Sequence, residues 1–140
     1  SRRLSVARSM MLRLSDEDAA AYQVFSELLR LPEDDARRQA EFTNALQRCI
    51  QAPRAVLAAT VDVLRLLETL PAITNRHLRS DLAIAAILCE AAARAAAWNA
   101  QVNVPMLASD AQKRNILDDV ARAVTECRER ADALEKACQD

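Results

Sequence analysis

The amino-acid sequence predicts an all-α protein, an antiparallel helical bundle of about five helices. Three observations lead to this expectation. The 140 residues contain no glycine, which excludes most tight hairpins and the glycine-dependent phosphate-binding loops. Alanine, leucine, arginine and glutamate dominate, and all four favour helices. Apolar residues recur at steps of three and four along most of the chain, which is the period of one helix face.

The first predicted helix covers roughly residues 4–31, and its apolar residues follow a heptad pattern. This seam consists of Leu4, Ala7, Met11, Leu14, Asp18, Ala21, Phe25 and Leu28. Asp18 is unusual in it, because a carboxylate on a buried face is costly unless it is paired. Two interpretations stay open. Either Ser15–Asp18 is a capping box that opens a new helix, or Asp18 is a buried and functional carboxylate.

Prolines divide the middle of the chain. Pro32 suits the first position of a second helix, with the acidic residues 33–35 at the positive end of its macrodipole. This helix is expected to stop before Pro53, and a third helix is expected from Pro53 to Pro71. The apolar positions predicted to face the core are Phe42, Leu46, Cys49, Ile50, Val56, Leu57, Val63, Leu64, Leu67 and Leu70.

A fourth helix is expected over residues 80–103, with Ser80 as its N-cap and Asp81 in its first turn. Its many alanines allow close helix–helix approach, so it is expected to be the central helix. The fifth helix opens with a capping box of Ser109 and Gln112. Its heptad seam consists of Leu117, Val120, Val124, Cys127, Ala131, Leu134 and Cys138. Two heptad seams around a small core predict self-association as a homodimer or higher homo-oligomer.

The composition narrows the class of protein. A length of 140 residues suits a single helical domain over residues 1–140, and a hydrophobic content of 51% argues against disorder. A net charge of −1 argues against binding nucleic acid through bulk charge. No apolar run is long enough to cross a membrane, and the start lacks a signal-peptide core. The protein is therefore expected to be soluble and cytoplasmic, with no nucleic-acid or membrane partner.

Cysteine and histidine are too sparse for a predicted metal site. The chain has one histidine, and its four cysteines lie far apart in the sequence. Small, buried, reduced thiols are the expected state of Cys49, Cys89, Cys127 and Cys138. The expectation is that no metal is bound.

The segment Pro71–Arg79 has no clear period and holds several candidate residues. His77 lies beside Arg76 and near Arg79, and the positive charge disfavours its protonated form. It is therefore either a neutral base or a solvated loop residue. Arg76, Arg79 and Arg54 are candidates for binding an anion, although most arginines of this chain simply face solvent.

Polar residues also stand at the two ends of the alanine-rich helix. Ser80 and Asp81 are explained as an N-cap pair without any further function. Asn99 and Asn103 are four apart and share one helix face, so they either close the helix or point into a polar cavity. Trp98 is expected to be a packing or oligomer contact rather than a stacking platform.

The order of these motifs resembles the cyclodeaminase/cyclohydrolase family, which comprises the cyclodeaminase domain of formiminotransferase-cyclodeaminase and the single-domain methenyltetrahydrofolate cyclohydrolases. Four stretches carry the resemblance over nearly the whole chain: "DEDAAAYQVFSELLRLPED" (16–34), "ALQRCIQAPRAV" (45–56), "NRHLRSDLAIAA" (75–86) and "NAQVNVPML" (99–107). The most specific part is the combination of Asn75, Ser80, Asp81, Asn99 and Asn103.

The resemblance implies an all-helical dimer with a folate site near the subunit interface and a tetrahydrofolate derivative as substrate. One implied reaction closes 5-formiminotetrahydrofolate to the 5,10-methenyl form and releases ammonia, as a cyclodeaminase. The other opens 5,10-methenyltetrahydrofolate with water to the 10-formyl form, as a cyclohydrolase. Both need a proton donor and acceptor, for which the candidates are Asp81, Asp18 and His77. The substrate-binding candidates are Asn75, Arg76, Arg79, Ser80, Asn99, Asn103 and Arg54.

One departure from the family keeps a second hypothesis open. Relatives carry an upstream helical region with a proline- and glycine-rich turn, which is missing here, and Thr74–Asn75 replaces the usual Gly-Asn pair. The chain is therefore either an N-terminally truncated fragment or a divergent relative that has lost activity or changed its ligand. The alternative function is a non-catalytic helical dimerisation or ligand-binding module.

Overall fold

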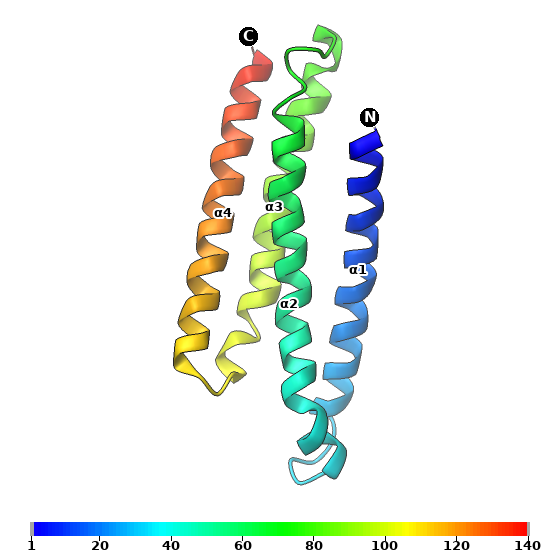
Figure 1. Cartoon of the computed structure of the whole chain (residues 1–140), viewed down its shortest axis with the longest axis vertical. Helices are drawn as coiled ribbons and strands as arrows, with labels where there is room; N and C mark the ends of the chain where they lie inside the picture. The colour runs from blue at the N-terminus through cyan, green and yellow to red at the C-terminus, as the bar shows by residue number, and fades with distance from the viewer. Residues whose placement is uncertain (1, 140) are drawn as a thin grey trace.

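Four long antiparallel helices make up the structure, a computed structural model that describes residues 2–139 (Figure 1). The helices are α1 (Arg2–Leu29), α2 (Ala36–Leu67), α3 (Arg79–Gln101) and α4 (Asp110–Gln139). Two short 3₁₀ turns, η1 (Arg76–Leu78) and η2 (Val104–Met106), flank α3. No strand occurs within residues 2–139, and the predicted all-α antiparallel bundle is confirmed.

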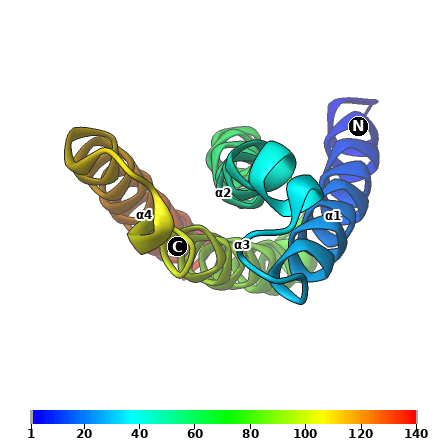
Figure 2. The same cartoon turned by 90° about the horizontal axis from the view of Figure 1, so that it is seen from below.

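The central helix is α2, and not the alanine-rich α3 as predicted. Seen along the bundle, α4, α3 and α1 form an arc around α2 (Figure 2), and α2 packs against all three. α1 packs mainly on α2, whereas α3 packs on both α2 and α4. Many buried residues line α2, while α3 buries mainly a row of alanines. Small side chains allow two helices to approach closely, but the helix that buries more large apolar side chains occupies the centre of the bundle.

Pro53 lies inside α2, so the two helices predicted on either side of it are one continuous helix. A proline lacks the N–H that would bond the carbonyl four residues earlier, which here belongs to Cys49. The side-chain amide of Asn103 donates to that carbonyl instead, at 3.5 Å. Pro53 itself is buried in the core. A replacement donor and the buried ring together explain why the predicted break does not occur.

The ends of two helices also differ from prediction. α2 begins at Ala36 rather than at Pro32, because Asp35 is its N-cap. The Asp35 Oδ1 atom accepts hydrogen bonds from the backbone N–H groups of Arg37 at 2.9 Å and Arg38 at 3.1 Å. The residues before Asp35 form a turn. Pro32 could occupy a first helical position, but the Asp35 side chain caps the helix, so the helix begins after it.

Ser80 is not a cap, because α3 begins one residue earlier and has no side-chain cap. The capping interaction belongs to Asn75, whose side-chain oxygen accepts a hydrogen bond from the N–H of His77 at 3.1 Å. At α4 the predicted capping box is confirmed: Ser109 Oγ accepts from the N–H of Gln112 at 3.3 Å.

Ser15–Asp18 lies within α1, which runs without a break. The capping-box interpretation of this run is therefore wrong, and Asp18 is a half-buried member of the α1 seam. On α4 the seam is also shifted in one place, where Leu117 is 39% exposed and Ile116 is buried instead.

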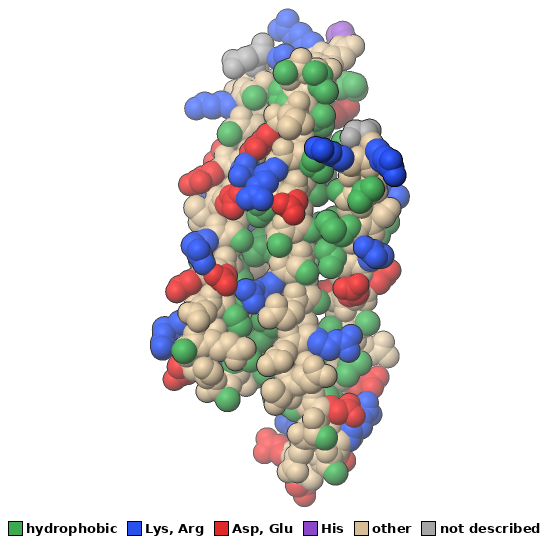
Figure 3. Space-filling view, in the orientation of Figure 1, with side chains coloured by type: hydrophobic (Ala, Val, Ile, Leu, Met, Phe, Trp, Pro, Cys, Tyr) green, Lys and Arg blue, Asp and Glu red, His purple; other side chains and the backbone are tan. Residues whose placement is uncertain are grey.

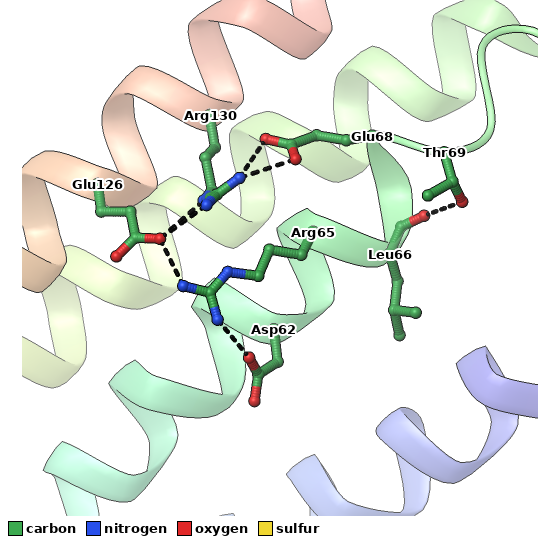
Figure 4. Close-up of polar contacts among 7 residues, drawn as sticks. All are labelled: Asp62, Arg65, Leu66, Glu68, Thr69, Glu126 and Arg130. Atoms are coloured by element: carbon green, nitrogen blue, oxygen red, sulfur yellow. Dashed lines mark hydrogen bonds and ion pairs between the residues drawn. The ribbon is translucent and has the colours of Figure 1, made fainter.

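Charged side chains connect α2 to α4 near the end of α2 (Figure 4). Arg130 donates to Glu68 at 2.8 and 2.9 Å and to Glu126 at 2.9 Å. Arg65 donates to Glu126 at 2.8 Å and to Asp62 at 3.1 Å. Hydrogen bonds from Arg130 and Arg65 lower the pKa of the Glu126 carboxyl. The cluster fixes the relative position of the two helices at this end of the bundle.

Candidate functional site

The predicted site residues fall into two groups at opposite ends of α3. The η1–α3 end contains Asn75, Arg76, His77, Arg79, Ser80 and Asp81. The α3–η2 end contains Asn99 and Asn103, with Asp18 of α1 near them. At a rise of 1.5 Å per residue the two ends of α3 are about 30 Å apart. A single chain therefore does not bring the two groups together.

A cleft of about 310 Å³ lies at the η1–α3 end, between the start of α3 and the end of α4. Its lining includes Arg76, Arg79, Ser80, Glu135 and Cys138. The Nε atom of Arg79 is buried and has no hydrogen-bond partner among the described residues. A buried donor without an acceptor is costly. The cleft therefore suits a ligand that supplies an oxygen acceptor, such as a carboxylate.

The side chains of Asp81 and His77 are both exposed. Asp81 lies in the first turn of α3, where the helix dipole favours a carboxylate. His77 is part of η1, and only its backbone N–H is engaged, with Asn75. Neither side chain is held by a hydrogen bond or ion pair within residues 2–139. One chain therefore gives these two groups no fixed orientation for proton transfer.

Asp18 is the candidate carboxylate that differs most from a solvated one. It is half-buried on α1, and this burial raises the pKa of its carboxyl. Burial also raises the pKa of the Cys49 thiol, and the charge of Asp18 raises it further, so the two side chains are close. A carboxyl with a raised pKa keeps its proton to higher pH, which suits a general acid.

Asn103 approaches the same part of α2 from the end of α3. Its Nδ2 atom donates to the carbonyl of Cys49 at 3.5 Å and to the carbonyl of Asn99 at 3.1 Å. Asp18 of α1 thus lies near Cys49, Asn103 reaches the Cys49 carbonyl from the turn after α3, and the side chain of Asn99 is exposed at the end of α3. The α3–η2 end therefore combines a protonatable carboxyl with an exposed amide.

Arg54 belongs to neither group. Its Nη2 atom donates to Asp119 Oδ2 of α4 at 3.0 Å, and its Nη1 atom donates to Gln51 at 3.3 Å. This arginine connects α2 to α4, so an anionic ligand would have to compete with Asp119 for it. Local sequence patterns do not predict this ion pair, because Arg54 and Asp119 lie far apart in the sequence.

A larger cleft lies elsewhere and was not predicted. It is an open groove of about 850 Å³ between the first half of α1 and the second half of α2, where apolar side chains gather along the facing edges of the two helices (Figure 3). Its lining includes Arg2, Arg3, Val6, Met10, Asp62, Val63, Arg65, Leu66 and Thr69. Val6 and Met10 are four residues apart and share this face of α1. The heptad seam predicted for the first helix lies on the neighbouring face.

The described residues offer no metal site, and burial raises the pKa of three of their thiols, those of Cys49, Cys89 and Cys127. Within residues 2–139, no group of three or more His, Cys, Asp or Glu side chains could hold a metal ion. The four cysteines are free, and burial raises the pKa of Cys127 to about 11. None of the described helices is both long and apolar enough to cross a membrane.

Comparison with known proteins connects this geometry to a family. Residues 1–122, which include α1 to α3 and both groups of candidate residues, match the model of the formiminotransferase-cyclodeaminase family. The chain belongs to this family. The resemblance predicted from the motifs of the sequence is thereby confirmed.

Two relatives show how far the similarity to formiminotransferase-cyclodeaminases extends. The formimidoyltransferase-cyclodeaminase of Sus scrofa is 26% identical over 129 residues, which are 89% of this chain and 24% of the pig protein. The chain thus spans about a quarter of that relative. The crystal structure of formiminotetrahydrofolate cyclodeaminase from Thermotoga maritima has the same fold, with a TM-score of 0.78 at 22% identity. The match covers 96% of this chain and 67% of the Thermotoga chain.

Proposed function

We propose that this chain acts on a one-carbon derivative of tetrahydrofolate, as a 5-formiminotetrahydrofolate cyclodeaminase. Its membership of the formiminotransferase-cyclodeaminase family supports the class of substrate. The names of the pig and the Thermotoga relatives both include cyclodeaminase, which favours the cyclodeaminase reaction over the cyclohydrolase reaction. The observation that carries the chemical part of the proposal is Asp18, a half-buried carboxyl with a raised pKa.

In the proposed reaction, N10 of 5-formiminotetrahydrofolate attacks the formimino carbon and forms a tetrahedral carbon between N5 and N10. The bond from this carbon to the amino group then breaks, which gives 5,10-methenyltetrahydrofolate and ammonia. Starting from the protonated formimino group, N10 loses one proton and the leaving nitrogen gains one, so that neutral ammonia leaves. A single carboxyl that takes up the first proton and supplies the second ends the cycle as it began.

Asp18 is the proposed proton carrier, since a raised pKa brings its protonated form closer to neutral pH than that of an exposed aspartate. Asn99 is proposed to orient the folate ring by hydrogen bonds. Arg76 and Arg79 are proposed to bind the glutamate carboxylates, which would supply the acceptor that the buried Arg79 Nε atom lacks.

The test is to follow the near-ultraviolet absorbance of methenyltetrahydrofolate as it forms from 5-formiminotetrahydrofolate. Asp18→Asn is expected to lower kcat by about 10²-fold or more, because the amide cannot exchange the proton. The matched control is Asp16→Asn, which changes an exposed carboxylate two residues away. Equal activity of the two variants would refute the role of Asp18.

The exposure of Asp81 and His77 favours a second candidate function, a non-catalytic module that binds folate or dimerises. Calorimetric binding of 5,10-methenyltetrahydrofolate without any acceleration of ring closure or ring opening would support this alternative. Ammonia release above the uncatalysed rate would exclude it.

A further inference from the structure

The groove of about 850 Å³ between the first half of α1 and the second half of α2 (the α1–α2 groove) has an apolar floor. Four of its lining residues carry apolar side chains larger than alanine, namely Val6, Met10, Val63 and Leu66. The Leu66 side chain lies on the α1 side of α2, away from the ion pairs around Glu126 (Figure 4). An apolar floor that is open to water favours a ligand with an apolar part.

A small side chain explains why the α1–α2 groove is not filled. Ala7 is the only buried residue in the first half of α1. Ala7 and Val63 also line a second cleft, of about 260 Å³, between α1, α2 and α3. The contact between α1 and α2 at this level is therefore narrow, because a short side chain occupies a seam position where a large one would fill the space. The space that remains is available to a small molecule.

Cations gather at one end of the α1–α2 groove. Because α1 and α2 are antiparallel, Arg2 and Arg3 at the start of α1 line the same end as Thr69 after α2. Both arginines are exposed, and neither has an ion pair within residues 2–139. The other charged lining residues, Arg65 and Asp62, pair with each other at 3.1 Å. Since the whole chain has a net charge of −1, the positive charge is a local property of this end.

We propose that the α1–α2 groove binds a medium-chain carboxylate, a fatty acid of about eight to ten carbons, whose extended length is about 10–12 Å. At 1.5 Å per residue, the lining from Arg2 to Met10 also spans about 12 Å. The carboxylate lies at Arg2 and Arg3, because a guanidinium can bind both of its oxygens. The hydrocarbon chain lies along Val6 and ends near Met10.

The size of the α1–α2 groove favours this class of ligand. Its volume is within the range of about 300–1,000 Å³ that is usual for small-molecule sites. A partner helix suits it less, because a standard protein interface needs about 800 Å² per partner and the groove has only four apolar side chains larger than alanine. The lining contains none of the candidate residues at the two ends of α3. The proposed site is therefore separate from the proposed folate chemistry.

The class of ligand is tested by calorimetric titration with octanoate and with octanol. Octanoate is expected to bind about tenfold more tightly, because the alcohol cannot pair with the arginines. The double variant Arg2→Met/Arg3→Met is expected to lose about tenfold in affinity for octanoate and none for octanol. The matched control is Arg13→Met/Arg30→Met, which removes two exposed arginines outside the groove. No binding of octanoate, or equal losses in the two double variants, would overturn the proposal.

The place of binding is tested by NMR of the methionine methyl groups. Met10 lines the groove, whereas Met106 is 41% exposed in η2, outside the groove. Octanoate is expected to shift the Met10 resonance and to leave that of Met106 in place. Met10→Glu is expected to weaken binding about tenfold or more, because it places a charge beside the hydrocarbon chain. Met106→Glu makes the same change outside the groove and is the control.

A shift of Met106 without a shift of Met10 would place the ligand on another apolar surface and overturn the proposal. Circular dichroism checks that Met10→Glu stays helical. If this variant unfolds, the Arg2→Met/Arg3→Met variant still decides, because both arginines are exposed.

Two other occupants of the groove give different results. A chain that co-sediments with phosphatidylglycerol vesicles but does not bind octanoate would assign the groove to a membrane surface. A dimer that Leu66→Glu dissociates, in a chain that does not bind octanoate, would assign the groove to a second copy. Either result overturns the proposal. None of these measurements uses folate turnover, so a failure of the proposed function leaves them decisive.

Discussion

At the scale of single residues, Asp18 differs from the other carboxylates of the candidate groups because the bundle partly buries it. The carboxyl has a raised pKa, and the Cys49 thiol beside it also has one. Neighbouring groups that both resist ionisation form a weakly polar environment in which a proton is held rather than released. Such a site is suited to proton exchange with a ligand, whereas the exposed Asp81 is suited to stabilising a helix terminus.

The raised pKa of Asp18 has a consequence for stability. The folded state holds this proton to higher pH than the unfolded state, so stability falls as pH rises from the ordinary carboxyl pKa through the raised one. Asp18→Asn removes the ionised form and is expected to raise Tm at pH 7, with the difference disappearing below about pH 4. Thermal unfolding at several pH values measures this. A variant that is less stable than the wild type at pH 7 would contradict it.

Asn103 is expected to act together with Pro53, because its amide satisfies the carbonyl that the proline leaves free. Asn103→Ala should therefore cost about 1 kcal/mol of unfolding free energy. In a Pro53→Ala background the restored N–H can bond the Cys49 carbonyl, and the same change should cost less. Urea unfolding of the double-mutant cycle measures the coupling. Equal costs in both backgrounds would show that the two residues act independently.

Arg79→Met is expected to weaken substrate binding more than turnover, since the proposed role of this side chain is to hold carboxylates far from the reacting carbon. KM should rise about tenfold while kcat changes little. Arg114→Met, an exposed position on α4, is the control. A fall in kcat at constant KM would move Arg79 out of the binding role.

At the scale of elements, α2 and α4 are held by an ion-pair cluster around Glu126. The depressed pKa of this carboxyl means that its contribution is present above its ordinary pKa, near 4.5, and is lost as pH falls through the depressed value. Glu126→Gln should lower stability at pH 7 by at most about 1 kcal/mol, because the group is partly exposed and screened. The loss should shrink at high salt and vanish at low pH. Glu129→Gln, an exposed neighbour, should have no effect.

The sequence predicted most of the elements because helix formation here depends on local composition and period. It failed at Pro53, where a residue 50 positions later supplies the missing hydrogen bond, and no local rule reports such a partner. The sequence also did not show which face of α3 is buried, because alanines occur both in the buried row and on the exposed outer face. A three-and-four spacing indicates that a face packs against another helix, but it does not indicate whether that helix belongs to the same chain.

The burial of the candidate site residues could not be read from the sequence for the same reason. The motifs identified the family and two groups of polar residues at the two ends of α3, but they did not show which side chains are buried. Only the fold shows that Asp18 is half-buried while Asp81 and His77 are exposed. The ion pair of Arg54 with Asp119 joins residues far apart in the sequence and was equally beyond local reasoning.

At the scale of the whole molecule, the arc of α4, α3 and α1 around α2 leaves the outer side of α3 free (Figure 2). This outer side carries the exposed apolar side chains of Ile84, Leu88 and Trp98. One chain keeps the two groups of candidate residues about 30 Å apart along α3. The proposed proton transfer therefore depends on the group around Asp18, and the group around Arg79 is proposed to act in substrate binding.

The most direct measurement is the specific rate of ammonia release from 5-formiminotetrahydrofolate for the wild-type chain, for Asp18→Asn and for the control Asp16→Asn. We expect the wild type and Asp16→Asn to exceed the uncatalysed rate, and Asp18→Asn to be slower by about 10²-fold or more. A wild-type chain that never exceeds the uncatalysed rate would contradict the proposed chemistry, and an Asp18→Asn chain as active as the wild type would contradict the role of Asp18.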